Sequence, residues 1–315
     1  MIISASRRTD IPAFYSEWLM NRIRAGYCKV PNPLNMKQVT RVSLDPANVE
    51  AIVFWSKNPA PLLPHLDELN KRGFYYYFQY TLNNYPSLLE PYVPSFERRI
   101  ETFKELSNMV GALRVVWRYD PIIISNITDF HFHKERFLWT AQELRGSTQR
   151  VMISIVDFYK KTEVRLSKLE KEEGVHFERD ILSSSLLPDL LKSFYEIAKG
   201  NDIEIFTCAE DTNFSSLGVP PGKCIDDGIL MQIQPRSVQY KKDPYQRKSC
   251  LCSVSKDIGL NNTCTHGCPY CYSTTSLEVA QRRYCEHDPN SEMLWGKVEP
   301  TDEQRLTNLP QQKLL

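Results

Sequence analysis

The chain lacks long apolar runs and any excess of charge of one sign. No apolar segment approaches the ~18 residues that a membrane-spanning helix needs, and the start, MIISASRRTD, lacks the apolar stretch of a signal peptide. With 39 Lys and Arg against 38 Asp and Glu, no field of the whole molecule attracts nucleic acid or an anionic membrane. We therefore expect a cytoplasmic protein without a membrane partner, in which any affinity for nucleic acid is local.

Histidine is also scarce, whereas cysteine is not. The six histidines are scattered and form no evident nucleophile-base pair, which argues against a hydrolytic barrel with purely structural thiols. The nine cysteines are an odd number, and thiols stay reduced in a reducing compartment. Metal binding is therefore the leading explanation for the clustered cysteines.

Strand-like and helix-like segments alternate through the first two thirds of the chain. Segments rich in β-branched and aromatic residues occupy residues 2–6, 51–55, 74–82, 113–119, 151–159 and 203–208. Glycine follows the helical pattern at Gly26, Gly73, Gly111, Gly146 and Gly200. Six strand-helix units predict an α/β protein with a parallel sheet, most simply an open or closed βα-barrel over residues 1–210. A doubly wound open sheet is the alternative.

The regular alternation is interrupted once and then stops. Residues 160–180 are dense in charge and predict a helical excursion or lid. Residues 211–315 predict a cysteine-rich C-terminal extension that packs over the barrel mouth within one integrated domain, with a short helix near residues 275–285.

Polar residues stand where each apolar segment stops. In βα-barrels the chemistry gathers at the C-terminal ends of the strands, so these residues predict a polar ligand pocket. They include Arg7, Arg8, Ser56, Lys57, Asn58, Gln79, Arg118, Asp120, Asp157, Cys208 and Glu210.

The segment CTHGCPYCY carries Cys264, Cys268 and Cys271 at the spacing Cys-x3-Cys-x2-Cys. Three such thiolates can hold three corners of an iron-sulfur cubane and leave one iron without a protein ligand. A zinc site is the alternative, completed by His266 or by the pair Cys250 and Cys252. For His266 we favour a donor role beside the ligands, or a surface position, over a role as a ligand.

The cysteine loop, with the aromatic residue Tyr270 before its third Cys, resembles the signature of radical S-adenosylmethionine enzymes, which share a (β/α)6-type partial TIM barrel. FWSKNP (54–59) and RVVWRYDPII (114–123) look like their counterparts in the spore photoproduct lyase branch. The whole chain is similar to the bacterial domain-of-unknown-function family numbered 1848.

This resemblance implies a 4Fe-4S cluster on the three cysteines, bound S-adenosylmethionine, and a 5'-deoxyadenosyl radical that takes a hydrogen atom from the substrate. It implies a flavodoxin- or ferredoxin-type electron donor. We expect Arg118, Asp120 and Lys57 to be catalytic, with Arg8 available to an anionic substrate. The expected cofactor contacts are Tyr270, Ser56, Asn58, Gln79, Arg7 and Glu210.

The chain departs from most radical S-adenosylmethionine enzymes in one respect. Their cysteine loop follows the first strand, whereas here it follows the sixth, and no Gly-Gly-Glu run follows the second strand. The arrangement is therefore permuted, with the last segment folding back over the barrel mouth.

Two further expectations concern the region before the loop. Cys208, Cys224, Cys250 and Cys252 suggest a second metal site, either an iron-sulfur cluster or zinc. Residues 236–249 mix basic and aromatic residues and suit either a solvated linker or a nucleic-acid edge. The substrate is thus a small molecule or a nucleic acid, and the alternative function is a non-catalytic metal-stabilised nucleic-acid-binding or sensor protein.

Overall fold

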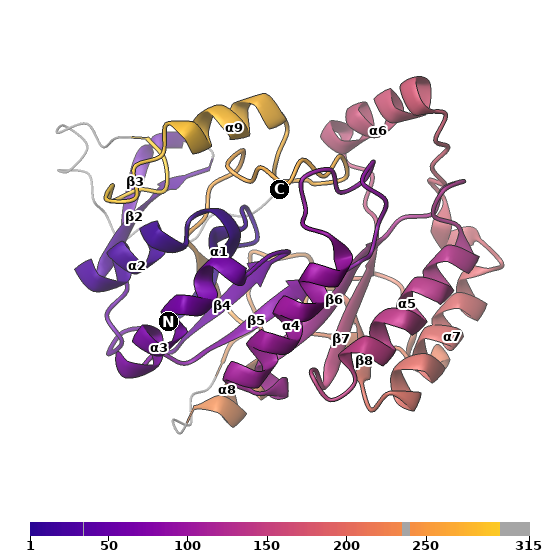
Figure 1. Ribbon diagram of the computed structural model, residues 1–315, viewed down its shortest axis with the longest axis horizontal. Helices are drawn as coiled ribbons and strands as arrows, with labels where there is room; N and C mark the ends of the chain where they lie inside the picture. The colour runs from indigo at the N-terminus through magenta and orange to yellow at the C-terminus, as the bar shows by residue number, and fades with distance from the viewer. Residues whose placement is uncertain (34, 235–239, 297–315) are drawn as a thin grey trace.

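A curled sheet of eight parallel strands forms a half-barrel in the computed structural model, which describes residues 1–33, 35–234 and 240–296 (Figure 1). The strand order is β10-β1-β4-β5-β6-β7-β8-β9. The strands are β10 (Ser255–Asp257), β1 (Ile2–Ala5), β4 (Ala51–Ser56), β5 (Tyr76–Thr81), β6 (Val115–Ile122), β7 (Arg150–Ile155), β8 (Glu204–Cys208) and β9 (Pro221–Gly222). All six predicted strands are present, and β1 to β8 follow one another in chain order without the reversal of a doubly wound sheet.

Helices cover the outer face of the sheet because their apolar sides pack on alternate strand residues. Phe137 and Phe194 stack with ring centroids 4.0 Å apart where two of these helices meet. The outer elements are α1 (Ile11–Phe14), α2 (Ser16–Ala25), α3 (Leu66–Lys71), α4 (Phe96–Val110), α5 (Phe130–Leu144), α7 (Leu187–Gly200) and the 3-10 turns Ala60–His65, Ala112–Arg114, Ile181–Ser183 and Ser215–Leu217.

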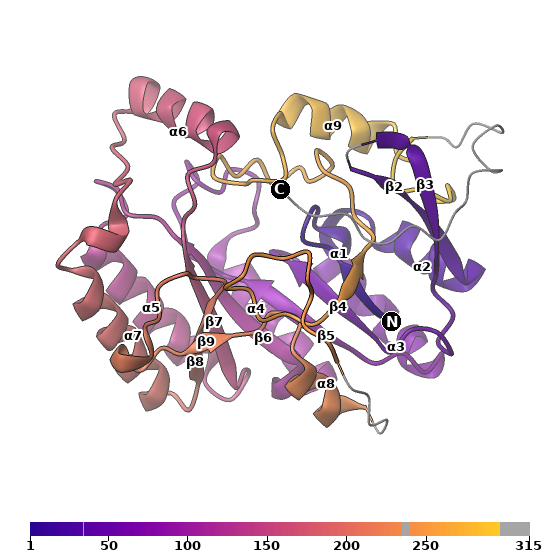
Figure 2. The same ribbon diagram turned by 180° about the vertical axis from the view of Figure 1, so that it is seen from behind.

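The segment between β9 and β10 packs on the inner face of the sheet, which Figure 2 shows from behind. Its helix α8 (Asp227–Ile233) and three of its cysteines form one apolar cluster with the strand residues Ile2, Val53, Tyr77, Val116 and Met152. At the centre of the sheet, the Tyr77 hydroxyl and the Gln79 amide donate to the Cys224 carbonyl at 2.6 and 2.7 Å. The predicted extension therefore contributes both edge strands, β9 and β10, and part of the inner core.

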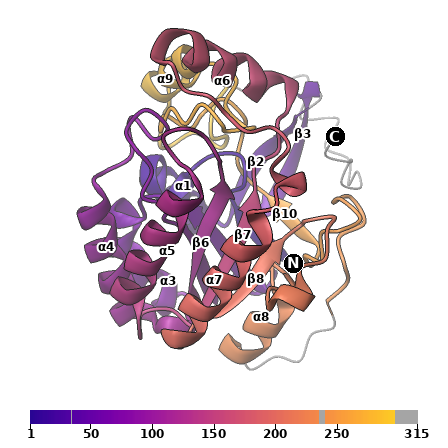
Figure 3. The same cartoon turned by 90° about the vertical axis from the view of Figure 1, so that its right-hand side faces the viewer.

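Two helices lie at the end of the half-barrel where the strands finish (Figure 3). The charge-dense segment forms α6 (Lys160–Glu173), as expected for a helical excursion, and the last predicted helix is α9 (Leu277–Cys285). Arg165 of α6 donates to the carbonyl of Pro269 at 2.9 Å, which joins α6 to the cysteine loop.

Two local features differ from the expectations. The antiparallel hairpin of β2 (Tyr27–Asn32) and β3 (Asn35–Ser43) follows α2 and was not predicted. Gly26, Gly73, Gly111 and Gly146 have positive φ, but Gly200 remains helical and Asp202 takes the positive φ of 60° instead. Among the described helices, none is both long and apolar enough to cross a membrane.

Candidate functional site

A cavity of about 1030 Å³ opens at the C-terminal edge of the sheet. Residues at or directly after the C-terminal ends of five different strands line it. They include Arg7, Arg8, Lys57, Asp120, Asp157 and Glu210. Seven cysteines also line the cavity, of which Cys208 ends β8 and six belong to the C-terminal segment.

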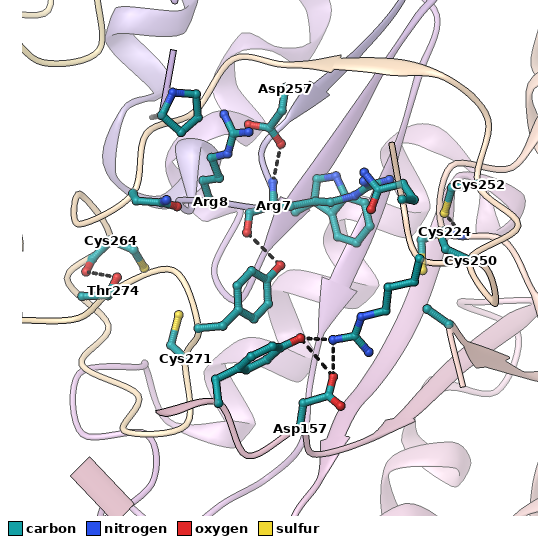
Figure 4. A pocket seen from close by; sticks show the side chains of 18 of the residues that line it. Arg7, Arg8, Asp157, Cys224, Cys250, Cys252, Asp257, Cys264, Cys271 and Thr274 are labelled. Carbon is teal, nitrogen blue, oxygen red and sulfur yellow. Dashed lines mark hydrogen bonds and ion pairs between the residues drawn. The ribbon is translucent and has the colours of Figure 1, made fainter. Parts of the chain in front are cut away.

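The cysteines form two separate groups on opposite sides of this cavity (Figure 4). We call Cys264, Cys268 and Cys271 the loop thiols, and Cys208, Cys224, Cys250 and Cys252 the inner thiols. Cys250 and Cys252 lie with Cys224, so they are not placed to complete a site on the loop thiols. Among the described residues, no group of three or more His, Cys, Asp or Glu side chains is preformed to hold a metal ion.

Contacts with the barrel fix the cysteine loop. The Tyr15 hydroxyl donates to the Thr263 carbonyl at 2.6 Å, and Arg165 holds the Pro269 carbonyl. Gly267 has a φ of 73°, and a Cβ there would lie 2.8 Å from the ring of Tyr92. The loop therefore needs glycine at this position, both for its backbone conformation and for its packing.

His266 is not available as a fourth ligand in this arrangement. Its side chain is buried, and its Nε2 lies 2.9 Å from a carboxylate oxygen of Asp10. Asp10 also accepts hydrogen bonds from the backbone amides of Ala13 and Lys57. Histidine and aspartate therefore join the loop to the ends of β1 and β4.

A buried ion network lies beside Cys268. Glu90 accepts from Lys57 at 2.7 Å, from Arg99 at 3.1 Å and from the Tyr270 hydroxyl at 2.7 Å. Burial alone would raise the pKa of Glu90, but the two cations hold it at about 2. Lys57, predicted as catalytic, is thus paired through its amine, and Glu90 was missed because no motif marks it.

Burial also raises the pKa values of two of the loop thiols. It raises the pKa of Cys268 to about 12 and that of Cys264 well above the usual range, so both are protonated in the metal-free protein. Their conversion to thiolate ligands therefore requires the loss of protons when a metal binds.

Arg118 and Asp120 form an ion pair at 2.7 Å, and Ser154 donates to the same carboxylate. Arg118 also reaches the Cys224 sulfur at 2.7 Å, so its guanidinium lies against the inner thiols. Burial would raise the pKa of Asp120, but the adjacent guanidinium holds it below its usual value. Of the three predicted catalytic residues, all line the cavity.

Two cations lie over one aromatic ring in the cavity wall. The guanidinium carbons of Arg7 and Arg118 lie 5.3 and 5.0 Å from the ring centroid of Trp55. The cavity therefore has a positively charged wall with an aromatic surface, which suits a ligand that carries a carboxylate or a phosphate.

The predicted cofactor contacts divide into two sets. Tyr270, Arg7 and Glu210 line the cavity. Ser56, Asn58 and Gln79 are not among the lining residues: Ser56 accepts from the backbone of Asn58, and Gln79 holds the Cys224 carbonyl. Their role at a cofactor stays a prediction.

The basic and aromatic segment before the loop makes mainly internal contacts where it is described. Tyr240 contacts the Gln234 amide, Lys242 donates to the Lys248 carbonyl, and Arg247 pairs with Asp157 at 2.6 Å. Arg236 lies outside the described residues. A nucleic-acid edge at this segment stays a prediction.

The raised pKa of Glu210 can be tested through the pH dependence of stability. Burial raises its pKa to about 7, with a further contribution from Asp157 and Asp120, so the folded protein holds a proton that the unfolded chain releases near pH 4.5. The stabilising effect of this proton is complete below about pH 4.5 and is lost as the pH rises to about 7. Glu210→Gln should therefore raise the melting temperature at pH 8, with a smaller gain at pH 5, whereas the exposed Glu196→Gln should show no such trend. A gain that is equal at both pH values would contradict the assignment.

The chain matches the family model described as a domain of unknown function, DUF1848, over residues 2–273. It belongs to this family. The matched range includes the half-barrel, the inner thiols and the loop thiols, and it ends directly after the cysteine loop. Neither the curated proteins nor the solved structures contain a match.

Proposed function

We propose that this DUF1848 protein is a radical S-adenosylmethionine-type enzyme whose fold is a permuted (β/α)6-type partial barrel with a cysteine-rich C-terminal extension. The observation that carries the proposal is the place of the loop thiols. Cys264, Cys268 and Cys271 come from one short loop, and all three line a cavity at the C-terminal edge of a parallel half-barrel. Three thiols without a nearby fourth ligand suit a 4Fe-4S cluster with one open iron.

The surroundings of the loop thiols fit such a group. His266 is held by Asp10, so histidine does not close the site, and Lys57 and Arg165 bring positive charge close to Cys268 and Cys271. A cluster with three thiolates is anionic overall, and nearby cations offset the cost of placing it in a partly buried site.

When bound, the cluster and S-adenosylmethionine supply a 5'-deoxyadenosyl radical that removes a hydrogen atom from the substrate. The residues of this chain would bind and orient the cofactor and the substrate, and they would shield both from water. Arg7 and Arg118 provide guanidinium groups for a carboxylate or phosphate, and Tyr270 lies in the cavity wall beside the loop thiols. Arg165 holds α6 against the loop, where that helix can restrict the access of water.

The size of the cavity favours a small anionic substrate over a duplex. At about 1030 Å³, it has room for the cofactor and a second small molecule, in line with the upper end of ligand pockets. A nucleotide or a single flipped base also meets these chemical requirements.

The direct test is cofactor cleavage. Protein purified without oxygen, loaded with iron and sulfide and reduced by dithionite should convert S-adenosylmethionine to 5'-deoxyadenosine and methionine, measured by liquid chromatography and mass spectrometry. The exposed Cys285→Ala variant should behave as the unaltered chain. A reduced preparation with a full iron content and no 5'-deoxyadenosine would overturn the proposal.

A further inference from the structure

The inner thiols come from three segments that are distant in the sequence. Cys208 ends β8, Cys224 follows β9, and Cys250 and Cys252 precede β10. The sulfurs of Cys208 and Cys224 lie 2.7 Å apart. The Cys252 sulfur accepts hydrogen bonds from the backbone amides of Cys224 and Ile225 at 3.3 and 3.4 Å. The fold thus brings four sulfurs together in one part of the inner core.

The charges around these sulfurs favour an anionic group. Arg118 reaches the Cys224 sulfur at 2.7 Å, and the buried Arg7 guanidinium lies close enough to Cys252, Cys224 and Cys250 to interact with their charges. The Nη2 atom of Arg7 is buried and has no hydrogen-bond partner. Four thiolates around a divalent cation carry two net negative charges, which would offset the buried positive charge of these guanidinium groups.

We infer that Cys208, Cys224, Cys250 and Cys252 bind one zinc ion as a closed tetrathiolate site. With Zn–S bonds of about 2.3 Å, the sulfurs of a tetrahedral site lie about 3.8 Å apart. The present Cys208–Cys224 separation of 2.7 Å is shorter, which explains why the group is not preformed around an ion. To reach the tetrahedral spacing, the sulfurs of Cys208 and Cys224 must move apart by about 1 Å.

An iron-sulfur cubane is a poorer fit at this position. Its iron and sulfide atoms lie between the cysteine sulfurs and hold them much farther apart than a single ion does. Cys224, Cys250 and Cys252 are all buried at 6% exposure or less and pack against Ile2 and Val53, so the segments would have to separate within the core.

Zinc at this site would fasten the C-terminal segment to the inner face of the half-barrel. The ligands lie on β8, beside the edge strand β9 and before the other edge strand β10. The ion would also fix the Cys224 carbonyl that Tyr77 and Gln79 hold, and with it the position of Arg118 in the cavity wall. This inference does not depend on the radical chemistry, because it concerns different cysteines and a different metal.

Metal analysis of the unaltered chain and three variants separates the two sites. The unaltered chain and the triple variant Cys264→Ala, Cys268→Ala, Cys271→Ala should each contain about one zinc per chain after anaerobic purification, whereas only the unaltered chain should contain iron. Cys252→Ser should lose the zinc, and Cys28→Ser, a buried thiol that lies in the other core cluster, should keep it. Iron in the triple variant, or a chain without zinc, would overturn the inference.

Cobalt titration keeps the test valid if Cys252→Ser fails to fold. The triple variant, stripped of zinc by a chelator, should bind one equivalent of Co²⁺ with the strong thiolate-to-metal absorption and visible bands of a tetrahedral sulfur site. A weak octahedral spectrum, or no binding, would show that the inner thiols do not form the proposed site.

Discussion

Cys268→Ala should abolish the formation of 5'-deoxyadenosine from S-adenosylmethionine. In the proposed site each loop thiolate holds one iron, and the cluster has only three protein ligands, so the loss of one leaves two. Cys268 is buried at 8% exposure beside Lys57 and Tyr270, where solvent cannot supply a substitute ligand as readily as at an exposed corner. The amount of 5'-deoxyadenosine after dithionite reduction measures the effect.

The fold of this variant must be checked independently. Circular dichroism and the zinc content of the inner thiols should stay unchanged, since Cys268 packs in a different core cluster from Cys224, Cys250 and Cys252. Cys285→Ala removes an exposed cysteine and serves as the matched control. Cleavage by Cys268→Ala at a rate close to that of the unaltered chain would rule out the loop thiols as the cluster ligands.

Glu90→Ala should lower the free energy of unfolding by about 3–5 kcal/mol, as expected when one partner of a buried ion network is removed. The Glu90 side chain is 1% exposed, and its loss leaves Lys57 and Arg99 without their shared carboxylate and Tyr270 without its acceptor. Lys57 and Arg99 are themselves largely buried, so water can compensate their charges only in part. Chemical denaturation at pH 7 measures the change.

Glu101→Ala on helix α4 is the comparison. Glu101 pairs with Arg98 at 3.2 Å, but both side chains are about two thirds exposed. Glu101→Ala should therefore lower the free energy of unfolding by at most about 1 kcal/mol. If Glu90→Ala lowers the free energy of unfolding as little as Glu101→Ala does, the buried Glu90 network does not stabilise the fold as proposed.

The sequence predicts the strands well because of how they are buried. Segments such as AIVFW and the run around Phe78 are apolar on both faces, which is required of a parallel strand covered by helices outside and by the C-terminal segment inside. The convergence of Arg7, Lys57, Asp120 and Glu210 follows from the same topology, because parallel strands bring their C-terminal ends to one edge.

Long-range contacts account for what the sequence does not predict. Glu90 lies in a connection without a motif, and its three partners come from positions 57, 99 and 270. The close approach of Cys208 and Cys224 depends on β9, a strand of two residues that is too short to give a periodic pattern. Likewise, β10 joins the sheet beside β1 only because the chain crosses the inner face first.

Quantification of iron and acid-labile sulfide after anaerobic reconstitution tests the central claim most directly. We expect about four iron and four sulfide per chain in the unaltered protein, and neither in the triple variant of Cys264, Cys268 and Cys271, with zinc retained in both. Zinc as the only metal of the unaltered protein would contradict the claim and would favour a metal-stabilised binding or sensor protein instead.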